Sequence, residues 1–297
     1  MDIAARGAAG LVMIAMPLVL GAYLVRKFKT GWGLFLVGAV TFFVSQIFHI
    51  PFNAYVLDPL LRSIGFDSTT GPGVTLAIAA ILLGLSAGVF EEGARWLAYR
   101  FWIRRARTWP QGVVFGSGHG GTEAIIAGLL AVATLIQLTA LQGQDLAAVV
   151  PAEQLAAAQA QVDAYWATPL WAAFAPVLER ASALAMQITL AVIVLQAFLR
   201  PRGGLWLLAA IGWHALVDAV AVFSGIATGV YSGSLSGILI TEGLIFALAG
   251  ISLVILFRLK PAATIPSAPP PAPTPHTGPV PGKDDDRAGV EASRYRD

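Results

Sequence analysis

The sequence predicts an all-α protein, a polytopic transmembrane helical bundle with about seven spans. Three observations support this fold class: the composition, the length of the apolar runs, and the distribution of cations between them. Of the 297 residues, 57% are hydrophobic and only 12% are charged, with a mean hydropathy of +0.72. Because soluble domains carry about 25% charged residues, this composition is typical of a membrane protein. We therefore expect a multi-pass protein of the cell membrane, with the lipid bilayer as its surroundings.

The apolar runs are long enough to cross the hydrocarbon core, which takes about 20 helical residues. The expected spans, in chain order, are residues 7–25, 33–50, 74–102, 111–138, 169–199, 204–223 and 235–257. Between the fourth and fifth spans, the stretch QLAAAQAQVDAYWATPLW is rich in alanine. That stretch predicts a further helix on the outer surface.

Lysine and arginine alternate from one connection to the next. They follow the first, third, fifth and seventh spans, at Arg26, Lys27, Lys29, Arg100, Arg104, Arg105, Arg107, Arg200, Arg202, Arg258 and Lys260. The positive-inside rule then places the N-terminus outside and the C-terminus in the cytoplasm. These cations account for most of the pI near 9.0 and the net charge of +2. We interpret them as orientation signals, and no nucleic-acid partner is expected.

The chain divides at about residue 260. Residues 1–260 form the predicted transmembrane domain, whereas 261–297 are rich in proline and small polar residues. That composition predicts a disordered cytoplasmic tail, since it cannot bury enough apolar surface to fold. Cysteine is absent from the chain, which excludes disulfides, thiolate metal ligands and a cysteine nucleophile.

Four of the expected spans contain groups of ionisable residues, in the motifs EEGAR, GHGGTEAI, LERASA and HALVD, whereas Glu242 in the last span has no local partner and stays unassigned. The candidate site residues in these motifs are Glu91, Glu92, Arg95, His119, Glu123, Glu179, His214 and Asp218. An ionisable side chain at membrane depth is expensive and is a functional candidate by default. At 1.5 Å per residue, Glu91, His119 and His214 lie about 14–18 Å from the cation-bearing helix ends. In a hydrocarbon core about 30 Å thick, this predicts one polar site near the midplane.

Within these motifs, three pairs of ionisable residues are four positions apart and therefore share a helix face. The pairs are Glu91 with Arg95, His119 with Glu123, and His214 with Asp218. Arg95 is expected to neutralise one of the two adjacent glutamates, because two carboxylates in a poorly solvated site do not both ionise cheaply. The other glutamate is then a candidate general base for activating water. The carboxylates that follow the histidines are expected to orient the imidazoles.

Structural alternatives exist for each of these residues. The Glu91–Arg95 and Glu179–Arg180 pairs could simply tie helices together, and His49 in SQIFHIPFN is interpreted as an interfacial residue. A proton-coupled transporter or channel is the main functional alternative, because proton relays are also built from buried Glu, His and Asp. The repeated halves and broken helices typical of many transporters are not found in the sequence. A non-catalytic binding or scaffold protein is a third alternative.

The order of the motifs EEGAR, GHGGTEAI, an ER-containing span and HALVD resembles the YhfC family of intramembrane metalloproteases. That family in turn resembles, distantly, the CAAX-prenyl-protease/bacteriocin-processing (CPBP) membrane proteases and PrsW. The resemblance covers about residues 45–257, including SQIFHIPFN, and excludes the tail. It implies an intramembrane endopeptidase that acts on peptide or membrane-protein substrates.

The resemblance also implies roles for individual residues. Glu91 would be the base, Glu92 its support, and His119 would hold the water or a metal. His214, with Asp218, would complete the site.

Two catalytic chemistries remain open. In a metalloprotease, His119, His214 and a carboxylate such as Glu123 would hold Zn²⁺. In a glutamic-type enzyme there is no metal, and histidine donors stabilise the oxyanion.

Two features depart from the pattern of the related proteases. The spacing here is EExxR, whereas CPBP proteases favour EExxxR. The ER-containing span has Gln187 in MQITL where a histidine is expected.

Overall fold

The computed structural model describes residues 2–66, 71 and 73–261, and all regular structure within them is helical. The helices, in chain order, are α1 (Asp2–Phe28), α2 (Trp32–Phe52), the π-helical turn η1 (Asn53–Leu57), α3 (Asp58–Ser63), α4 (Val74–Leu97), the π-helical turn η2 (Ala98–Trp102), α5 (Trp109–Leu141), the 3₁₀ turns η3 (Leu146–Ala148) and η4 (Ala152–Gln154), α6 (Leu155–Ala167), α7 (Leu170–Ala173), α8 (Ala175–Leu199), α9 (Gly203–Ala227), the 3₁₀ turn η5 (Val230–Ser232) and α10 (Leu235–Arg258). The predicted all-α class is confirmed.

Within the described part of the chain, 7 helical segments are long and apolar enough to cross a membrane. They are Asp2–Phe28, Trp32–Ser63, Val74–Trp102, Trp109–Leu141, Leu170–Gln196, Gly203–Ala227 and Leu235–Arg258. Each overlaps one expected span, so the seven-span prediction is confirmed. The second segment is longer than expected, because α2 continues through η1 into α3. All of the expected disordered tail, residues 261–297, except Pro261 lies outside the described residues, and the orientation of the termini stays a prediction.

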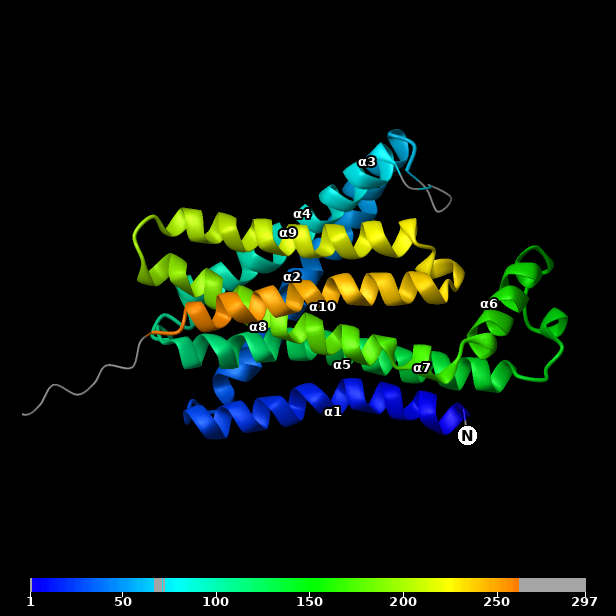
Figure 1. Cartoon of the computed structure of the whole chain (residues 1–297), viewed down its shortest axis with the longest axis horizontal. Coiled ribbons are helices and arrows are strands. Elements are labelled where there is room, and N and C mark those ends of the chain that lie inside the picture. Colours follow the sequence, from blue (N-terminus) through cyan, green and yellow to red (C-terminus); the bar gives the residue numbers. More distant parts are fainter. Residues whose placement is uncertain (1, 67–70, 72, 262–297) are drawn as a thin grey trace, which may run out of the picture. The chain divides into compact units, whose positions relative to one another are not determined.

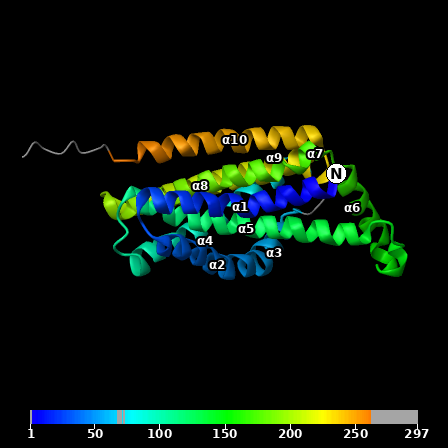
Figure 2. The ribbon, with the colours of Figure 1, turned by 90° about the horizontal axis from the view of Figure 1, so that it is seen from below.

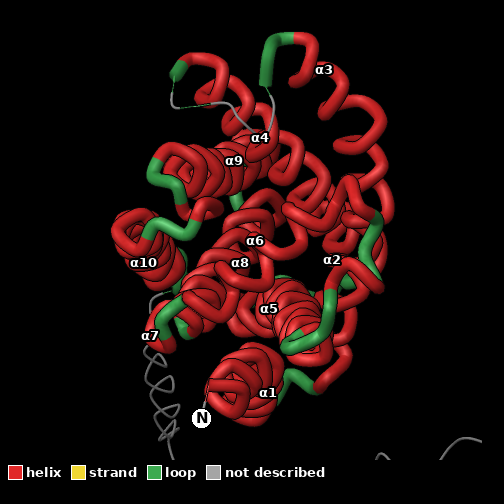
Figure 3. The backbone as a smooth tube through the Cα atoms, turned by 90° about the vertical axis from the view of Figure 1, so that its right-hand side faces the viewer, coloured by secondary structure: helices red, strands yellow, loops and turns green. Residues whose placement is uncertain are grey.

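Helices α5 and α8 form the centre of the bundle. In the view along the helices, they lie among α1, α2, α4, α9 and α10 (Figure 3). Every residue of α8 from Met186 to Gln196 is buried, a pattern without an exposed face. A helix that is apolar and buried all round is a core helix rather than a surface one. Figure 2 shows α10 and α2 on opposite sides of this core.

The polar motifs reach the core on differently oriented helices. Figure 1 shows α1, α5, α8, α9 and α10 running roughly along one direction, with α2 and α4 crossing at an angle. Helix α4 packs against α9 and α2 and carries the EEGAR motif inward. The alanine-rich stretch forms α6, as predicted, and its Val162 packs with Leu138 near the end of α5.

Glycines on both sides of His119 allow α5 to approach two neighbouring helices closely. A β-carbon at Gly118 would collide with the backbone carbonyl of Phe35 in α2. At Gly120, a β-carbon would lie 2.5 Å from the β-carbon of Gln187 in α8. Small residues are typical of positions where transmembrane helices pack closely. His119 therefore lies at the junction of α2, α5 and α8.

Candidate active site

Arg95 lies between the two adjacent glutamates of α4. Its side chain is 0% exposed, and its guanidinium forms an ion pair with Glu92 one turn away. Its Nη2 also lies 3.6 Å from Glu91 Oε2 and donates a hydrogen bond to Gln187 Oε1 in α8. The sequence predicted that Arg95 neutralises one glutamate. In the structure the guanidinium contacts both, and the contact with Glu92 is the shorter.

Glu91 is surrounded by polar groups from three other helices. His119 Nε2, from α5, lies 3.1 Å from Glu91 Oε2. Gln187 Nε2, from α8, donates to the same oxygen at 3.2 Å, and Gln46 Nε2, from α2, donates to Oε1 at 3.1 Å. The ring of His119 also packs edge-on against Phe42. These contacts fix the orientation of a carboxylate that is almost fully buried.

His214 contacts both a glutamate of α4 and the aspartate one turn along α9. Its Nδ1 lies 2.7 Å from Glu92 Oε1, and its Nε2 lies 3.5 Å from Asp218 Oδ2. The expected neighbour Asp218 is therefore present, but Glu92 is closer. We call Glu91, Glu92, Arg95, His119 and His214 the inner cluster; all five are buried.

A second group of charges, the outer cluster, comprises Glu123, Glu179, Arg180 and Asp218. Arg180 Nη1 donates to Glu123 Oε1 at 2.6 Å, and its Nη2 donates to Glu179. Glu123 was expected to orient His119. Its hydrogen-bond partners are instead Arg180 and Gln187, whose Nε2 donates to Glu123 Oε2 at 2.8 Å. The amide of Gln187 therefore joins the two clusters, since it donates to one glutamate in each.

A cavity of about 70 Å³ lies where the two clusters meet. Its polar lining comes from α5, α8 and α9 and comprises Glu123, Glu179, Arg180, Gln187, His214 and Asp218. A water molecule needs about 10–15 Å³ of such volume and two to four polar partners. The cavity is therefore large and polar enough to hold water beside His214.

Three buried polar atoms of the inner cluster have no hydrogen-bond partner among the described residues. They are Glu92 Oε2, Arg95 Nε and His119 Nδ1. A buried polar atom left unpaired costs about 1–3 kcal/mol. These atoms are therefore free to bind a water molecule or a polar group of a substrate.

The donors named for zinc from the sequence do not form one ligand set in this arrangement. A catalytic zinc has three protein ligands and an open fourth position. In the parts of the chain that the structure describes, no group of three or more His, Asp or Glu side chains is arranged to hold a metal ion. His119 contacts Glu91, His214 contacts Glu92, and Glu123 contacts Arg180. Moreover, the guanidinium of Arg95 already places a fixed positive charge between the two carboxylates. The residues as arranged do not fit zinc.

Several amide and hydroxyl side chains near the site were not predicted from the sequence, namely Gln46, Asn53 and Ser86. His49, interpreted as interfacial, lies with its Nε2 3.1 Å from Ser86 Oγ and 3.1 Å from Asn53 Nδ2. Gln46, one turn before His49, contacts Glu91 directly. Gln46, His49 and Asn53 are spaced i, i+3 and i+7, which places them on one helix face. That spacing within SQIFHIPFN is the signal that could have found them.

A family model and a known protein match this chain. The model of the YhfC intramembrane metalloprotease family matches residues 12–244, which include both clusters. The "Uncharacterized membrane protein YhfC" of Bacillus subtilis (strain 168) is 32% identical over 217 residues, covering 72% of this chain and 81% of that protein. No solved structure matches the chain. These matches do not favour the transporter alternative, and the distant relation to CPBP proteases and PrsW stays a prediction.

Proposed function

This chain belongs to the YhfC intramembrane metalloprotease family, and from that premise we propose that it is an endopeptidase in which Glu91 activates the hydrolytic water. Its substrates would be peptides or membrane proteins whose cleaved bond lies within or beside the bilayer. The inner cluster, fully enclosed by α2, α4, α5, α8 and α9, would perform the chemistry. The outer cluster would supply water through the cavity beside His214.

The observation that carries the proposal is the environment of the Glu91 carboxylate. Donors from Gln46 and Gln187, together with the imidazole of His119, hold it in one orientation. A general base must be positioned within hydrogen-bond reach of the proton it takes, directly or through one water. A water bound to Glu91 would meet this requirement, and the unpartnered Nδ1 of His119 and Oε2 of Glu92 belong to the same cluster.

Hydrolysis would then proceed in two steps. Glu91 takes a proton from the water as the water oxygen bonds to the carbonyl carbon, and the π electrons move to the carbonyl oxygen. Glu91 then returns the proton to the amide nitrogen as the C–N bond breaks, which leaves a carboxylic acid and an amine. The first step creates an oxyanion, and N–H donors placed at such an oxygen contribute about 10²–10³ to kcat.

His214 is the candidate donor to that oxyanion. It lies between Glu92 and Asp218, and carboxylate partners fix the orientation of an imidazole. Glu92 would act through His214 rather than on the substrate. Arg95 would balance the charge of both glutamates, because a carboxylate buried without a partner is strongly destabilising.

The proposal uses no metal step, since the arrangement of the inner cluster does not fit zinc. The family description includes a metal, and a zinc ion would act as a Lewis acid and activate water if it were bound. In this chain, the side chains named as its ligands, His119, His214 and Glu123, are already paired with Glu91, Glu92 and Arg180. A glutamate-activated water fits these contacts directly.

The test is cleavage of a fluorogenic transmembrane peptide by the purified full-length protein in lipid nanodiscs. Glu91→Gln should abolish cleavage, because the amide keeps the shape of the side chain but cannot accept the proton. Glu153→Gln is the matched control, since Glu153 is an exposed glutamate of the turn η4 outside both clusters. It should cleave at the wild-type rate. Cleavage by Glu91→Gln at that rate would overturn the proposal.

A further inference from the structure

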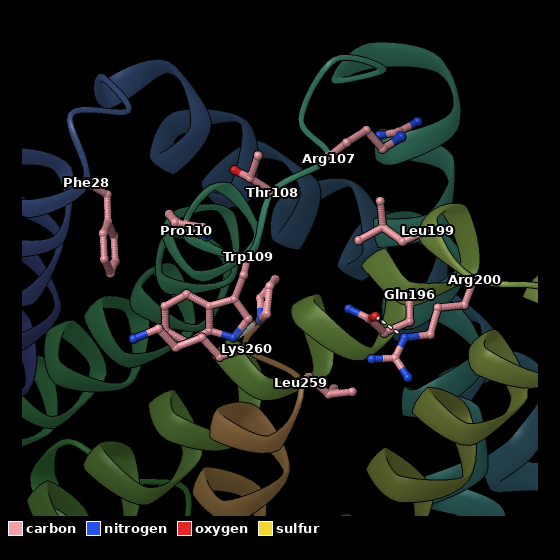
Figure 4. A pocket seen from close by; sticks show the side chains of 11 residues that line it. Phe28, Arg107, Thr108, Trp109, Pro110, Gln196, Leu199, Arg200, Leu259 and Lys260 are labelled. Atoms are coloured by element: carbon pink, nitrogen blue, oxygen red, sulfur yellow. Dashed lines mark hydrogen bonds between the residues drawn. The ribbon is translucent and has the colours of Figure 1, made fainter. Parts of the chain in front are cut away.

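A second and larger cavity lies at the cation-rich end of the bundle. It has a volume of about 530 Å³ and lies between the ends of α1, α5, α8 and α10. Among the described residues, its charged lining consists of Arg107, Arg200 and Lys260, with no Asp or Glu. In Figure 4, Trp109 with Lys260 beside it lies across from Gln196 and Arg200. None of these residues belongs to the inner or outer cluster.

The three cations of this cavity have no carboxylate partner among the residues that the structure describes. Within the described residues, no ion pair involves Arg107, Arg200 or Lys260. Arg200 donates instead to Gln196 Oε1 at 2.9 Å, and Lys260 Nζ lies 5.6 Å from the centre of the Trp109 ring. Arg107 donates to backbone carbonyls, including that of Tyr99 at 3.0 Å. The side chains are thus held in place while their positive charge stays uncompensated, and the cavity favours an anion.

The rest of the lining is apolar. Phe28, Pro110, Leu199 and Leu259 form its walls together with the ring of Trp109. Arg200 directly follows α8, and Lys260 lies two residues beyond α10, so both cations lie where a span leaves the hydrocarbon. A ligand for this cavity needs a negative head and an apolar body at the membrane interface.

We propose that this cavity binds the phosphate headgroup of an anionic phospholipid. Basic pockets between transmembrane helices are a recognised form of headgroup site, and arginine suits phosphate oxygens because its planar donors bind two at once. The apolar walls favour a lipid over a free phosphate ion, because only the lipid brings acyl chains to cover them. The occupant is therefore a structural lipid that joins α1, α5, α8 and α10 at one end.

The test is native mass spectrometry of the full-length protein, titrated with phosphatidylglycerol or with neutral phosphatidylcholine. We expect the first phosphatidylglycerol to bind at least tenfold more tightly than phosphatidylcholine. The double variant Arg200→Gln/Lys260→Gln should lose about tenfold or more of that affinity, as each cation near an anionic lipid contributes measurably. It leaves Arg107, which also holds backbone carbonyls, unchanged.

The matched control is Arg104→Gln/Arg202→Gln, which removes two exposed cations from the same end that do not line the cavity. It should keep the wild-type affinity within about twofold. An equal loss of phosphatidylglycerol affinity in both double variants would show that the lipid is attracted to the whole cation-rich end of the bundle. That result would overturn the proposed site. Displacement of the lipid by millimolar inorganic phosphate would indicate a soluble anion site instead and would also overturn the proposal. The readout is binding, so it is independent of any peptidase activity.

Discussion

The inner and outer clusters are both built around an arginine but differ in their exposure. Each has an arginine paired with two glutamates, and Gln187 connects them. The side chain of Arg95 is 0% exposed, whereas those of Arg180 and Glu179 are 17% and 35% exposed. A buried pair that loses one partner leaves an uncompensated charge, whereas a partly exposed pair is screened by solvent. The inner cluster is therefore suited to hold reacting groups in place, and the outer cluster to admit water.

The largest effect should come from Arg95→Met, which removes the cation and leaves Glu91 and Glu92 buried without it. We expect the free energy of unfolding to fall by about 3–5 kcal/mol. Arg180→Met, the equivalent change in the outer cluster, should lower it by only about 1 kcal/mol. Denaturant titration of both purified variants in the same micelles measures the difference. Equal losses would show that the two clusters do not differ in the way that their burial indicates.

The next effect concerns catalysis. His119→Gln should lower kcat about a hundredfold or more, because it removes the imidazole that lies beside Glu91. KM should stay within about threefold, since His119 is proposed to act on the water rather than to bind substrate. Glu179→Gln, in the outer cluster, should leave kcat within about threefold. Peptide cleavage measured over a range of substrate concentrations separates the two constants. A rise in KM with unchanged kcat would instead place His119 in substrate binding.

Gln187 tests the connection between the clusters and should have an intermediate effect. Gln187→Met keeps the volume but removes the hydrogen bonds to Glu91 and Glu123, and we expect kcat to fall about 10- to 100-fold. Gln187→His, which restores an N–H donor, should recover part of the loss. Side-by-side kinetics of the two variants, with thermal unfolding as the control for folding, distinguish positioning from packing. Identical rates in both variants would mean that the hydrogen bonds of Gln187 do not position the base.

The smallest effect should follow from Glu179→Gln on stability. This glutamate shares Arg180 with Glu123, so its loss leaves the arginine paired. We expect a change of about 0.5 kcal/mol or less. Glu92→Gln should cost several times more, because Glu92 is fully buried against Arg95 and His214. Thermal unfolding of both variants in nanodiscs provides the measurement, and a larger loss for Glu179→Gln would reverse the ranking of the clusters.

The spans could be predicted from the sequence because a membrane helix needs about 20 apolar residues, a requirement that is local in the chain. The spacing of His214 and Asp218 likewise predicted a contact that the helix geometry alone provides. The choice of partners between helices could not be predicted in this way. Glu123 contacts Arg180 in α8 instead of His119 in its own helix, and this depends on how α5 and α8 are rotated against each other.

Neutral side chains of the site were harder to find than charged ones. Gln46 and Gln187 both donate to Glu91, but a glutamine within an apolar span is a weaker anomaly than a glutamate or an arginine. Gln187 attracted attention only as a departure from the pattern of related proteases. A buried carboxylate requires hydrogen-bond donors. The donors that Glu91 needs therefore indicate nearby amide side chains better than the positions of charged residues do.

The most direct test of the account is peptide cleavage by metal-depleted protein, with the metal content of the same sample determined by elemental analysis. The wild-type protein should cleave at an unchanged rate when its zinc content is below about a tenth of the protein concentration, while Glu91→Gln is inactive in every condition. Activity that is lost on chelation and restored by Zn²⁺ would contradict the account, since it would show that a metal, and not Glu91 alone, activates the water.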